Sequence, residues 1–196
     1  IYARLGRFLP DLNRNSPEIA KVVHKLKEME AEGYTYENAD GSFELLALDT
    51  LGRRPSFFRV LDYHVLSQQG KGGMDAQAYL KIEVNGKQGI NAAEGDGPVN
   101  ALDLALRKTL ALFYPSVRKM RLKDFKVCVL NSQGTASRVR VSIESTDCIH
   151  LWKTVGLHNN IILASLRALI DSVDYMLTSY VSEEEIRAAA LMDPEE

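Results

Sequence analysis

The sequence lacks an excess of charge of either sign, long apolar runs and more than two cysteines. Its 196 residues include 24 lysines and arginines against 26 aspartates and glutamates, a net charge of −2. This balance gives no support to nucleic acid as a partner. No apolar run approaches the roughly 20 residues that span a bilayer, and the N-terminus lacks the apolar core of a signal peptide. We therefore expect neither a nucleic-acid nor a membrane partner.

The two cysteines, Cys128 and Cys148, lie in stretches that predict strands. They could form a disulfide, but two thiols in a chain of this size fit a reducing compartment at least as well. A cytoplasmic location is therefore expected. Cys128 alternates with Val127 and Val129, which predicts a small side chain in the core.

No group of side chains has the pattern of a catalytic or metal site. The four histidines share no metal-ligand spacing with one another or with a cysteine; they are His24, His64, His150 and His158. No serine lies in a nucleophile elbow, and no P-loop or dinucleotide loop is present. The glutamates at 183–185 predict an acidic, solvated helix. We expect no catalytic residue, metal or cofactor in this chain.

Residues 1–54 predict a small helical linker. Ser16 followed by Pro17 predicts a helix N-cap, and apolar residues then recur at helical spacing until Gly33. A second short helix is predicted at residues 41–48, and neither helix has enough apolar residues for a core of its own. The chain begins with Ile1 rather than methionine, which favours a piece of a longer protein.

From about residue 56 the apolar period changes to that of strands. Strands are predicted at residues 56–68, 76–84 and 87–95, and a helix from Val99 to Phe113. The order then recurs, with strands at 121–132, 136–145 and 148–156 and a helix within 159–177. The helices match at an offset of 60 residues and the middle strands at 61. Asn85-Gly86 predicts a type I′ hairpin turn.

The predicted fold is α+β, with two repeated βββα units related by a pseudo-two-fold axis and preceded by small linker helices. The expected boundaries are 1–54 for the linker, 55–182 for the two units (about 56–116 and 120–180) and 183–196 for an acidic C-terminal tail. Small open sheets leave a face or an edge for a partner, so a homodimer is expected.

The joint between the third strand and the first long helix reads EGDGPVN. Gly95 and Gly97 would allow close backbone approach and unusual φ angles, and Pro98 presets the first helical turn. A helix N-terminus offers N–H groups and a positive partial charge to a carboxylate or phosphate. The alternative is a tight turn before a well-capped helix, with no ligand.

The matching joint of the second unit contains a glycine, His158, and Asn159 or Asn160 as a helix cap. Two equivalent helix N-termini would form a cleft lined by Val99, Leu157 and Ile161. Such a cleft suits an amphipathic zwitterion better than a phosphate.

Three stretches together resemble the C-terminal regulatory domain of the 2-isopropylmalate synthase family: AAEGDGPVNALDLALRKTL, MRLKDFKVCVLNSQGTASRVRVSIES and WKTVGLHNNIILASLRALIDSVDYML. The upstream EMEAEGYTYENADGSFELL is more similar to the citramalate synthase branch. The resemblance implies an effector site at both joints, comprising Gly95, Asp96, Gly97, Pro98, Val99, Asn100, Ala101, Leu157, His158, Asn159, Asn160 and Ile161.

The resemblance also implies the role of the domain. It would form a homodimer and bind leucine or isoleucine as a feedback inhibitor. A TIM barrel elsewhere in the full-length protein would condense acetyl-CoA with a 2-oxo acid, using a divalent metal that this chain would not bind. The alternative is a purely structural dimerisation module with no effector site.

Overall fold

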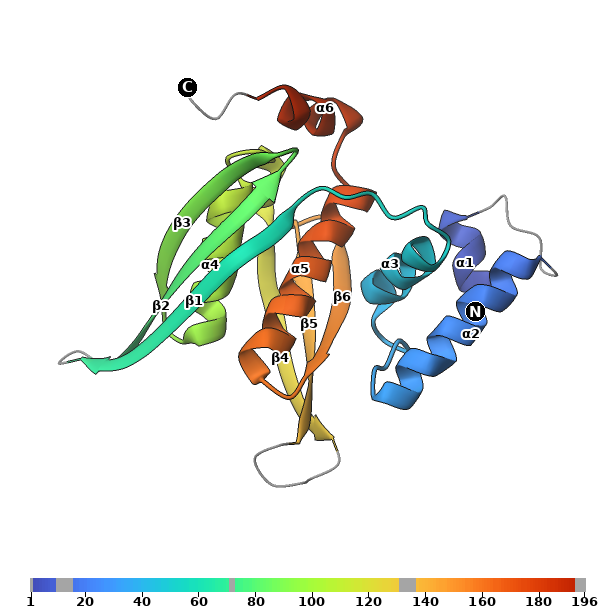
Figure 1. Ribbon diagram of the computed structural model, residues 1–196, viewed down its shortest axis with the longest axis horizontal. Coiled ribbons are helices and arrows are strands. Elements are labelled where there is room, and N and C mark those ends of the chain that lie inside the picture. Colours follow the sequence, from blue (N-terminus) through green and yellow to red (C-terminus); the bar gives the residue numbers. More distant parts are fainter. Residues whose placement is uncertain (1, 10–15, 71–72, 131–136, 193–196) are drawn as a thin grey trace. The chain divides into compact units, whose positions relative to one another are not determined.

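The computed structural model describes residues 2–9, 16–70, 73–130 and 137–192. Figure 1 shows the order of the elements along the chain. The helices are α1 (Tyr2–Phe8), α2 (Pro17–Glu32), α3 (Asp40–Thr50), α4 (Pro98–Leu110), α5 (Ile161–Ser179) and α6 (Glu183–Leu191), with a 3-10 helix, η1, at Pro115–Lys119. The strands are β1 (Arg59–Gly70), β2 (Gly73–Val84), β3 (Lys87–Gly95), β4 (Arg121–Leu130), β5 (Arg138–Thr146) and β6 (Leu151–His158).

The first βββα unit is an antiparallel sheet of order β1-β2-β3 that packs against α4 (Figure 1). Asn85 and Gly86 have φ angles of 51° and 81°, which confirms the predicted type I′ turn. Alternate residues of β2 are buried, and they face the apolar stripe of α4. These residues are Ala76, Ala78, Leu80, Ile82 and Val84 on β2, with Leu102, Leu106 and Leu110 on α4.

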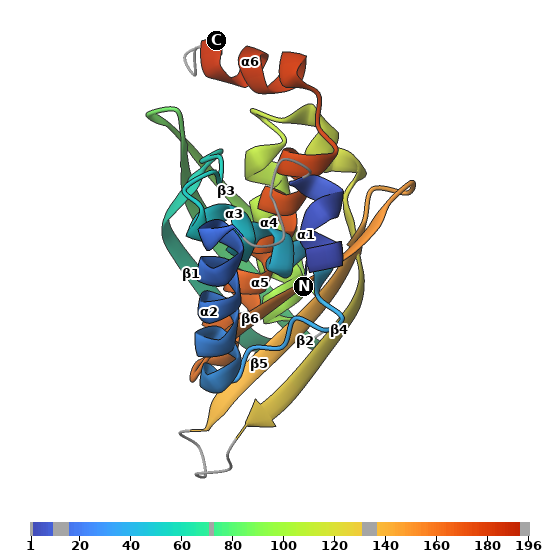
Figure 2. The ribbon, with the colours of Figure 1, turned by 90° about the vertical axis from the view of Figure 1, so that its right-hand side faces the viewer.

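The second βββα unit is a sheet of order β4-β5-β6 with α5 packed on β6. The Trp152 indole N–H donates to the Ser172 hydroxyl at 2.9 Å, and the Thr154 hydroxyl donates to the Ala168 carbonyl at 2.7 Å. Figure 2 shows β4 and β5 as long neighbouring strands. The α+β class with two βββα units is thus confirmed, whereas their pseudo-two-fold relation stays a prediction.

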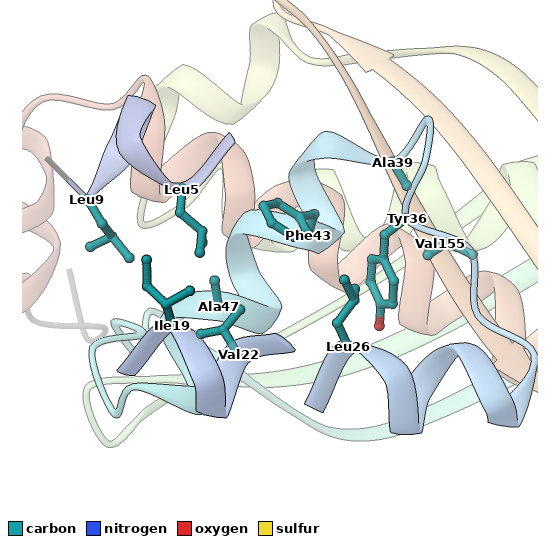
Figure 3. Close-up of a cluster of buried hydrophobic side chains, with 10 residues drawn as sticks. All are labelled: Leu5, Leu9, Ile19, Val22, Leu26, Tyr36, Ala39, Phe43, Ala47 and Val155. Atoms are coloured by element: carbon teal, nitrogen blue, oxygen red, sulfur yellow. The ribbon is translucent and has the colours of Figure 1, made fainter. Parts of the chain in front are cut away.

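The three N-terminal helices share one core, which explains how two helices without cores of their own are stabilised. The predicted cap is confirmed, because Ile19 N–H bonds to the Ser16 hydroxyl and Gly33 ends α2 with φ at 115°. Figure 3 shows the side chains of the helices meeting around Phe43. The cluster also contains Val155 of β6, so the second sheet completes this core; its members are Leu5, Leu9, Ile19, Val22, Leu26, Tyr36, Ala39, Phe43, Ala47 and Val155.

Polar contacts fix the N-terminal helices to the second sheet. Ser42 of α3 lies at the edge strand β6, where its hydroxyl oxygen accepts from Val155 N–H at 2.9 Å. This contact covers part of an edge that would otherwise be open to other chains. Arg138 and Arg140 of β5 donate to the carbonyls of Glu32 and of the cap residue Gly33 at the end of α2, at 2.7 and 2.9 Å, where cations are favoured.

The chain divides into two compact units, whose borders cut across β4, β5, β6 and α5. The linker-containing unit comprises residues 1–55, 124–144 and 152–175. The first-repeat unit comprises residues 56–123, 145–151 and 176–196.

Two expectations about single residues were wrong. Cys128 is exposed rather than part of the core, because β4 is an edge strand whose last residues, including Val127 and Val129, remain exposed. Glu185 does not belong to a fully solvated helix: its carboxylate is half-buried and accepts from Ser116 N–H at 2.7 Å and from the Ser116 hydroxyl.

The described residues contain neither a helix of membrane-spanning kind nor a metal-binding cluster. None of their helices is both long and apolar enough to cross a bilayer. Within the same ranges, no three His, Cys, Asp or Glu side chains gather closely enough to hold a metal ion.

Candidate functional site

The first joint is an extended turn between β3 and α4. Gly97 is the N-cap of α4, with φ at −168° and ψ at 169°, and its carbonyl accepts from Ala101 N–H at 2.9 Å. The expectation of unusual φ angles was wrong, because the described glycines with positive φ are Gly33, Gly52 and Gly86. The joint therefore uses backbone conformations that other residues can also adopt.

Within the first joint, the backbone lies closest to neighbouring atoms at Gly95. A Cβ added there would lie 2.5 Å from Asn100 Oδ1 and 2.6 Å from Ala101 N. Asn100 Oδ1 also accepts from Asp96 N–H at 3.2 Å, which closes the turn. A Cβ added at Gly97 would meet no heavy atom within 4 Å in the described parts of the chain. Gly95 is thus required sterically and Gly97 is not.

The start of α4 is not capped by a side chain of the described residues. Pro98 contributes no N–H, and the N–H groups of Val99 and Asn100 belong to the first turn, which has no carbonyl of its own helix to bind. Asp96 and Asn100 are exposed, Gly97, Pro98 and Val99 are half-buried, and Ala101 is buried. This geometry leaves N–H groups and a positive partial charge beside a half-buried valine, which suits the carboxylate of an apolar molecule.

The second joint is closed by its own side chains. Asn160 Oδ1 accepts from Ile162 N–H at 2.8 Å and from Leu163 N–H at 3.2 Å, so Asn160 is the cap, one of the two alternatives predicted. His158 Nδ1 accepts from Asn160 N–H at 2.9 Å, which requires the tautomer or charge state with an unprotonated Nδ1. The asparagine therefore already occupies N–H groups that a ligand would use.

The other residues of the second joint differ in exposure. Leu157 is buried, and its carbonyl accepts from Arg167 Nη1 at 2.8 Å. Asn159 is exposed and Ile161 is 42% exposed, so neither side chain is enclosed within the linker-containing unit.

Sequence reasoning did not include Gly156 among the site residues. A Cβ there would lie 2.0 Å from Ala164 O and 2.8 Å from Ala168 N, so β6 and α5 approach as closely as backbones allow. Gly156 matches Gly95 at the strand offset of 61 residues, and this repetition is the signal that could have identified it.

The two joints belong to different units. Residues 95–101 lie in the first-repeat unit and residues 157–161 in the linker-containing unit. Each set is brought together by its own strand and helix. The cleft expected between the two sets stays a prediction, as does the assignment of these residues to an effector.

A partly buried charge cluster was also missed. Arg54 Nη2 donates to Asp171 Oδ1 at 2.9 Å and to Asp174 Oδ2 at 2.6 Å, while the Ser42 hydroxyl donates to Asp171 Oδ2 at 3.3 Å. Burial raises the pKa of both carboxyl groups, that of Asp174 to about 6, against the opposing effect of the Arg54 guanidinium. Because 117 and 120 residues separate the partners, no local pattern predicts this cluster.

Comparison with known proteins places this geometry in a family. The chain is 43% identical over 180 residues to the (R)-citramalate synthase of Geobacter sulfurreducens, covering 90% of the chain and 34% of that relative. It is 41% identical over 177 residues to the (R)-citramalate synthase of Aquifex aeolicus, with 89% and 34% covered. A probable 2-isopropylmalate synthase of Methanosarcina mazei is 23% identical over 166 residues, with 84% and 31% covered.

The chain therefore spans about a third of the length of the curated relatives that it matches. The family model described as "LeuA allosteric (dimerisation) domain" matches residues 37–177, which include α3, the first βββα unit and the second one up to Leu177. The chain thus belongs to the LeuA allosteric (dimerisation) domain family.

Proposed function

We propose that this chain is the regulatory part of a longer enzyme and that it binds a branched-chain amino acid, isoleucine or leucine, as a feedback inhibitor. The observation that carries the proposal is the uncapped start of α4 at Gly97 in a domain of an allosteric family. The amino acid's carboxylate would bind the first-turn N–H groups, and its branched side chain would contact Val99. Of the two amino acids, we favour isoleucine as the effector, because the more similar relatives are named citramalate synthases.

The longer protein is proposed to be an acyltransferase of the citramalate or 2-isopropylmalate synthase type. Relatives with those names support this, and the chain corresponds to about a third of their length. The divalent metal and acetyl-CoA are assigned to a catalytic domain outside these residues. A homodimer is proposed as well, supported by the family description and by the exposed apolar Val127 and Val129 on the edge strand β4.

A thermal-melt titration of the chain with isoleucine, leucine, valine and alanine tests the proposal. A ligand at about 100 times its dissociation constant stabilises by about 2.7 kcal/mol. For a chain of this size this corresponds to a rise of roughly 5–10 °C in Tm. A rise with one branched amino acid and none with alanine is the expected result.

Two variants of Gly97 test whether the ligand binds at the start of α4. Gly97→Ser adds a hydroxyl that can cap α4 and compete with the ligand carboxylate, so the ligand-induced rise in Tm should largely disappear. Gly97→Ala adds only a Cβ, which meets no described atom within 4 Å, and should respond like the wild type. If no branched amino acid raises the Tm of a dimeric chain, the domain is a structural dimerisation module.

A further inference from the structure

The linker-containing unit holds a cavity of about 300 Å³ that none of the predicted effector residues lines. Its walls come from α2, the segment after it, α3, Arg54, β6 and α5, so residues far apart in the sequence line it, and it is partly open to solvent. This volume lies at the lower end of the range for small-molecule sites. Apolar side chains form part of the wall, namely Met29, Leu46, Val155 and Ile170.

The same cavity is lined by charges of both signs. Asp49 and Asp171 are acidic, and Lys25, Arg54 and Arg167 are basic. A phosphate would meet the two carboxylates, and a divalent cation would meet the two guanidinium groups. Asp49 and Arg167 are exposed and the other three charged residues are half-buried. A molecule that carries one charge of each sign can pair with both the acidic and the basic side chains.

The acidic side is held in place before any ligand arrives. Arg54 and Ser42 each donate to one oxygen of Asp171, at 2.9 and 3.3 Å, which fixes the carboxylate. A carboxylate has about four lone-pair sites, so Asp171 can still accept from an ammonium group. Asp49 is exposed on α3 and adds a second negative charge.

The basic side is provided by Arg167 of α5. One of its nitrogens donates to the Leu157 carbonyl at 2.8 Å, and a guanidinium has five N–H donors in all. Tyr34 lies close to this guanidinium and stacks on Tyr36, with ring centroids 5.9 Å apart. Arg167 therefore combines a fixed position with remaining donors for a carboxylate.

We propose that this cavity is a second amino-acid site, which binds a free α-amino acid with an apolar side chain. Its ammonium group binds Asp49 and Asp171, its carboxylate binds Arg167, and its side chain contacts Leu46 and Ile170. The ligand class rests on the proposed function, whereas the site uses different residues. A ligand bound here contacts α3 and α5 at once and so holds the linker helices on the second repeat.

Calorimetric titration of the full chain with L-isoleucine and L-leucine tests this site. Two binding events per chain are expected for the wild type. Arg167→Met and Asp49→Asn should each weaken one event at least tenfold, and Gly97→Ser should remove only the other. Asp49 is exposed, so its variant keeps the test informative if Arg167→Met folds poorly. 4-Methylpentanoate and 3-methylbutylamine, which lack the ammonium and the carboxylate respectively, should not bind the cavity.

The outcomes separate the two proposals. A single event that Gly97→Ser removes and that Arg167→Met and Asp49→Asn leave unchanged would overturn the second site while the proposed function stands. A single event lost in Arg167→Met and Asp49→Asn but kept in Gly97→Ser supports the cavity and contradicts the joint site. Absence of binding by either amino acid contradicts both.

Discussion

The two βββα units have the same order of elements but begin their helices differently. In the first unit, α4 starts at Gly97 and no described side chain caps it. In the second, Asn160 caps α5 with two hydrogen bonds, and His158 holds the Asn160 N–H. One repeat therefore leaves its helix N-terminus open to a ligand, and the other closes it with its own side chain. Repetition of a fold does not imply repetition of a site.

Charged residues differ in the same way. Arg107 of α4 matches Arg167 of α5 at the helix offset of 60 residues. Arg107 pairs with Asp103 in its own helix, whereas the position that matches Asp103 in α5 is Leu163. Arg167 instead bonds to a backbone carbonyl and lines the cavity. The first unit uses its arginine for stability, and the second leaves its arginine available for binding.

The largest difference between the units is expected from replacing these two arginines. Arg107→Met leaves the buried Asp103, which is 2% exposed, without its partner and also removes a bond to the Met120 carbonyl. Breaking such a pair costs about 3–5 kcal/mol of unfolding free energy. Arg167→Met loses a hydrogen bond to the Leu157 carbonyl and the contact with Tyr34, each worth about 1 kcal/mol. Urea denaturation of both variants measures the unfolding free energy that each one loses. Equal losses would contradict a stabilising role for Arg107 that Arg167 lacks.

The next effect concerns pH and Asp174 of α5, whose counterpart after α4 is Tyr114. Burial raises the pKa of Asp174 from 3.8 to about 6, so between these values the folded chain binds more protons than the unfolded one. The unfolding free energy therefore falls as the pH rises from about 4 through about 6. A rise of roughly two pKa units corresponds to on the order of 3 kcal/mol.

Asp174→Asn removes the titrating carboxyl group. The unfolding free energy of the variant relative to wild type should therefore increase by on the order of 3 kcal/mol between pH 4 and pH 7. Asp147→Asn is the matched control. Burial opposes ionisation of Asp147, but hydrogen bonds from His150 and Ile149 outweigh it and lower its pKa to about 2. The stability due to Asp147 is present above its unfolded pKa and is lost only as the pH falls through about 2. Denaturation at several pH values between 4 and 7 should show a stability difference from wild type that changes with pH for Asp174→Asn but not for Asp147→Asn.

Glycine substitutions give the third comparison. Gly156→Ala places a methyl group against the α5 backbone at Ala164 and Ala168, so strand and helix must separate. Such overpacking costs about 1–3 kcal/mol and sometimes more. Gly95→Ala meets the movable Asn100 side chain and the backbone N and Cα of Ala101, but its closest contact, at 2.5 Å, is longer than the 2.0 Å at Gly156, so it should cost less. Gly97→Ala should change stability by under about 0.5 kcal/mol. A thermal-melt series that does not follow this order would contradict the close approach at Gly156.

The repeated architecture was predictable because local signals determine it. The alternation in β2, the Asn85-Gly86 turn, the Ser16 cap and the Gly33 terminus each follow from a few neighbouring residues, and all are confirmed. The exposure of Cys128 was not predictable, because alternation alone does not tell an edge strand from a central one.

The candidate site was predicted less completely than the fold. The glycines of the first joint were identified, but which of them is sterically required depends on where Asn100 and Ala101 lie. The cavity and the Arg54 cluster combine residues more than 100 positions apart, and such contacts have no local pattern. A cap at Asn159 or Asn160 could be predicted because capping involves only the next few residues, and the structure assigns it to Asn160.

The smallest effects are expected from exchanging the two helix starts. Asn160→Ala removes the side-chain cap of α5 and should cost about 1 kcal/mol of unfolding free energy, while Gly97→Ser should stabilise the free chain by only a few tenths of a kcal/mol. Thermal melts without amino acids measure both changes, and Asn159→Ala, at an exposed neighbour, is the control. A Tm of Asn160→Ala equal to that of the control would mean that water replaces the cap. In that case the second helix start would be as open to a ligand as the first, and the difference between the two units would lie only in their glycines and arginines.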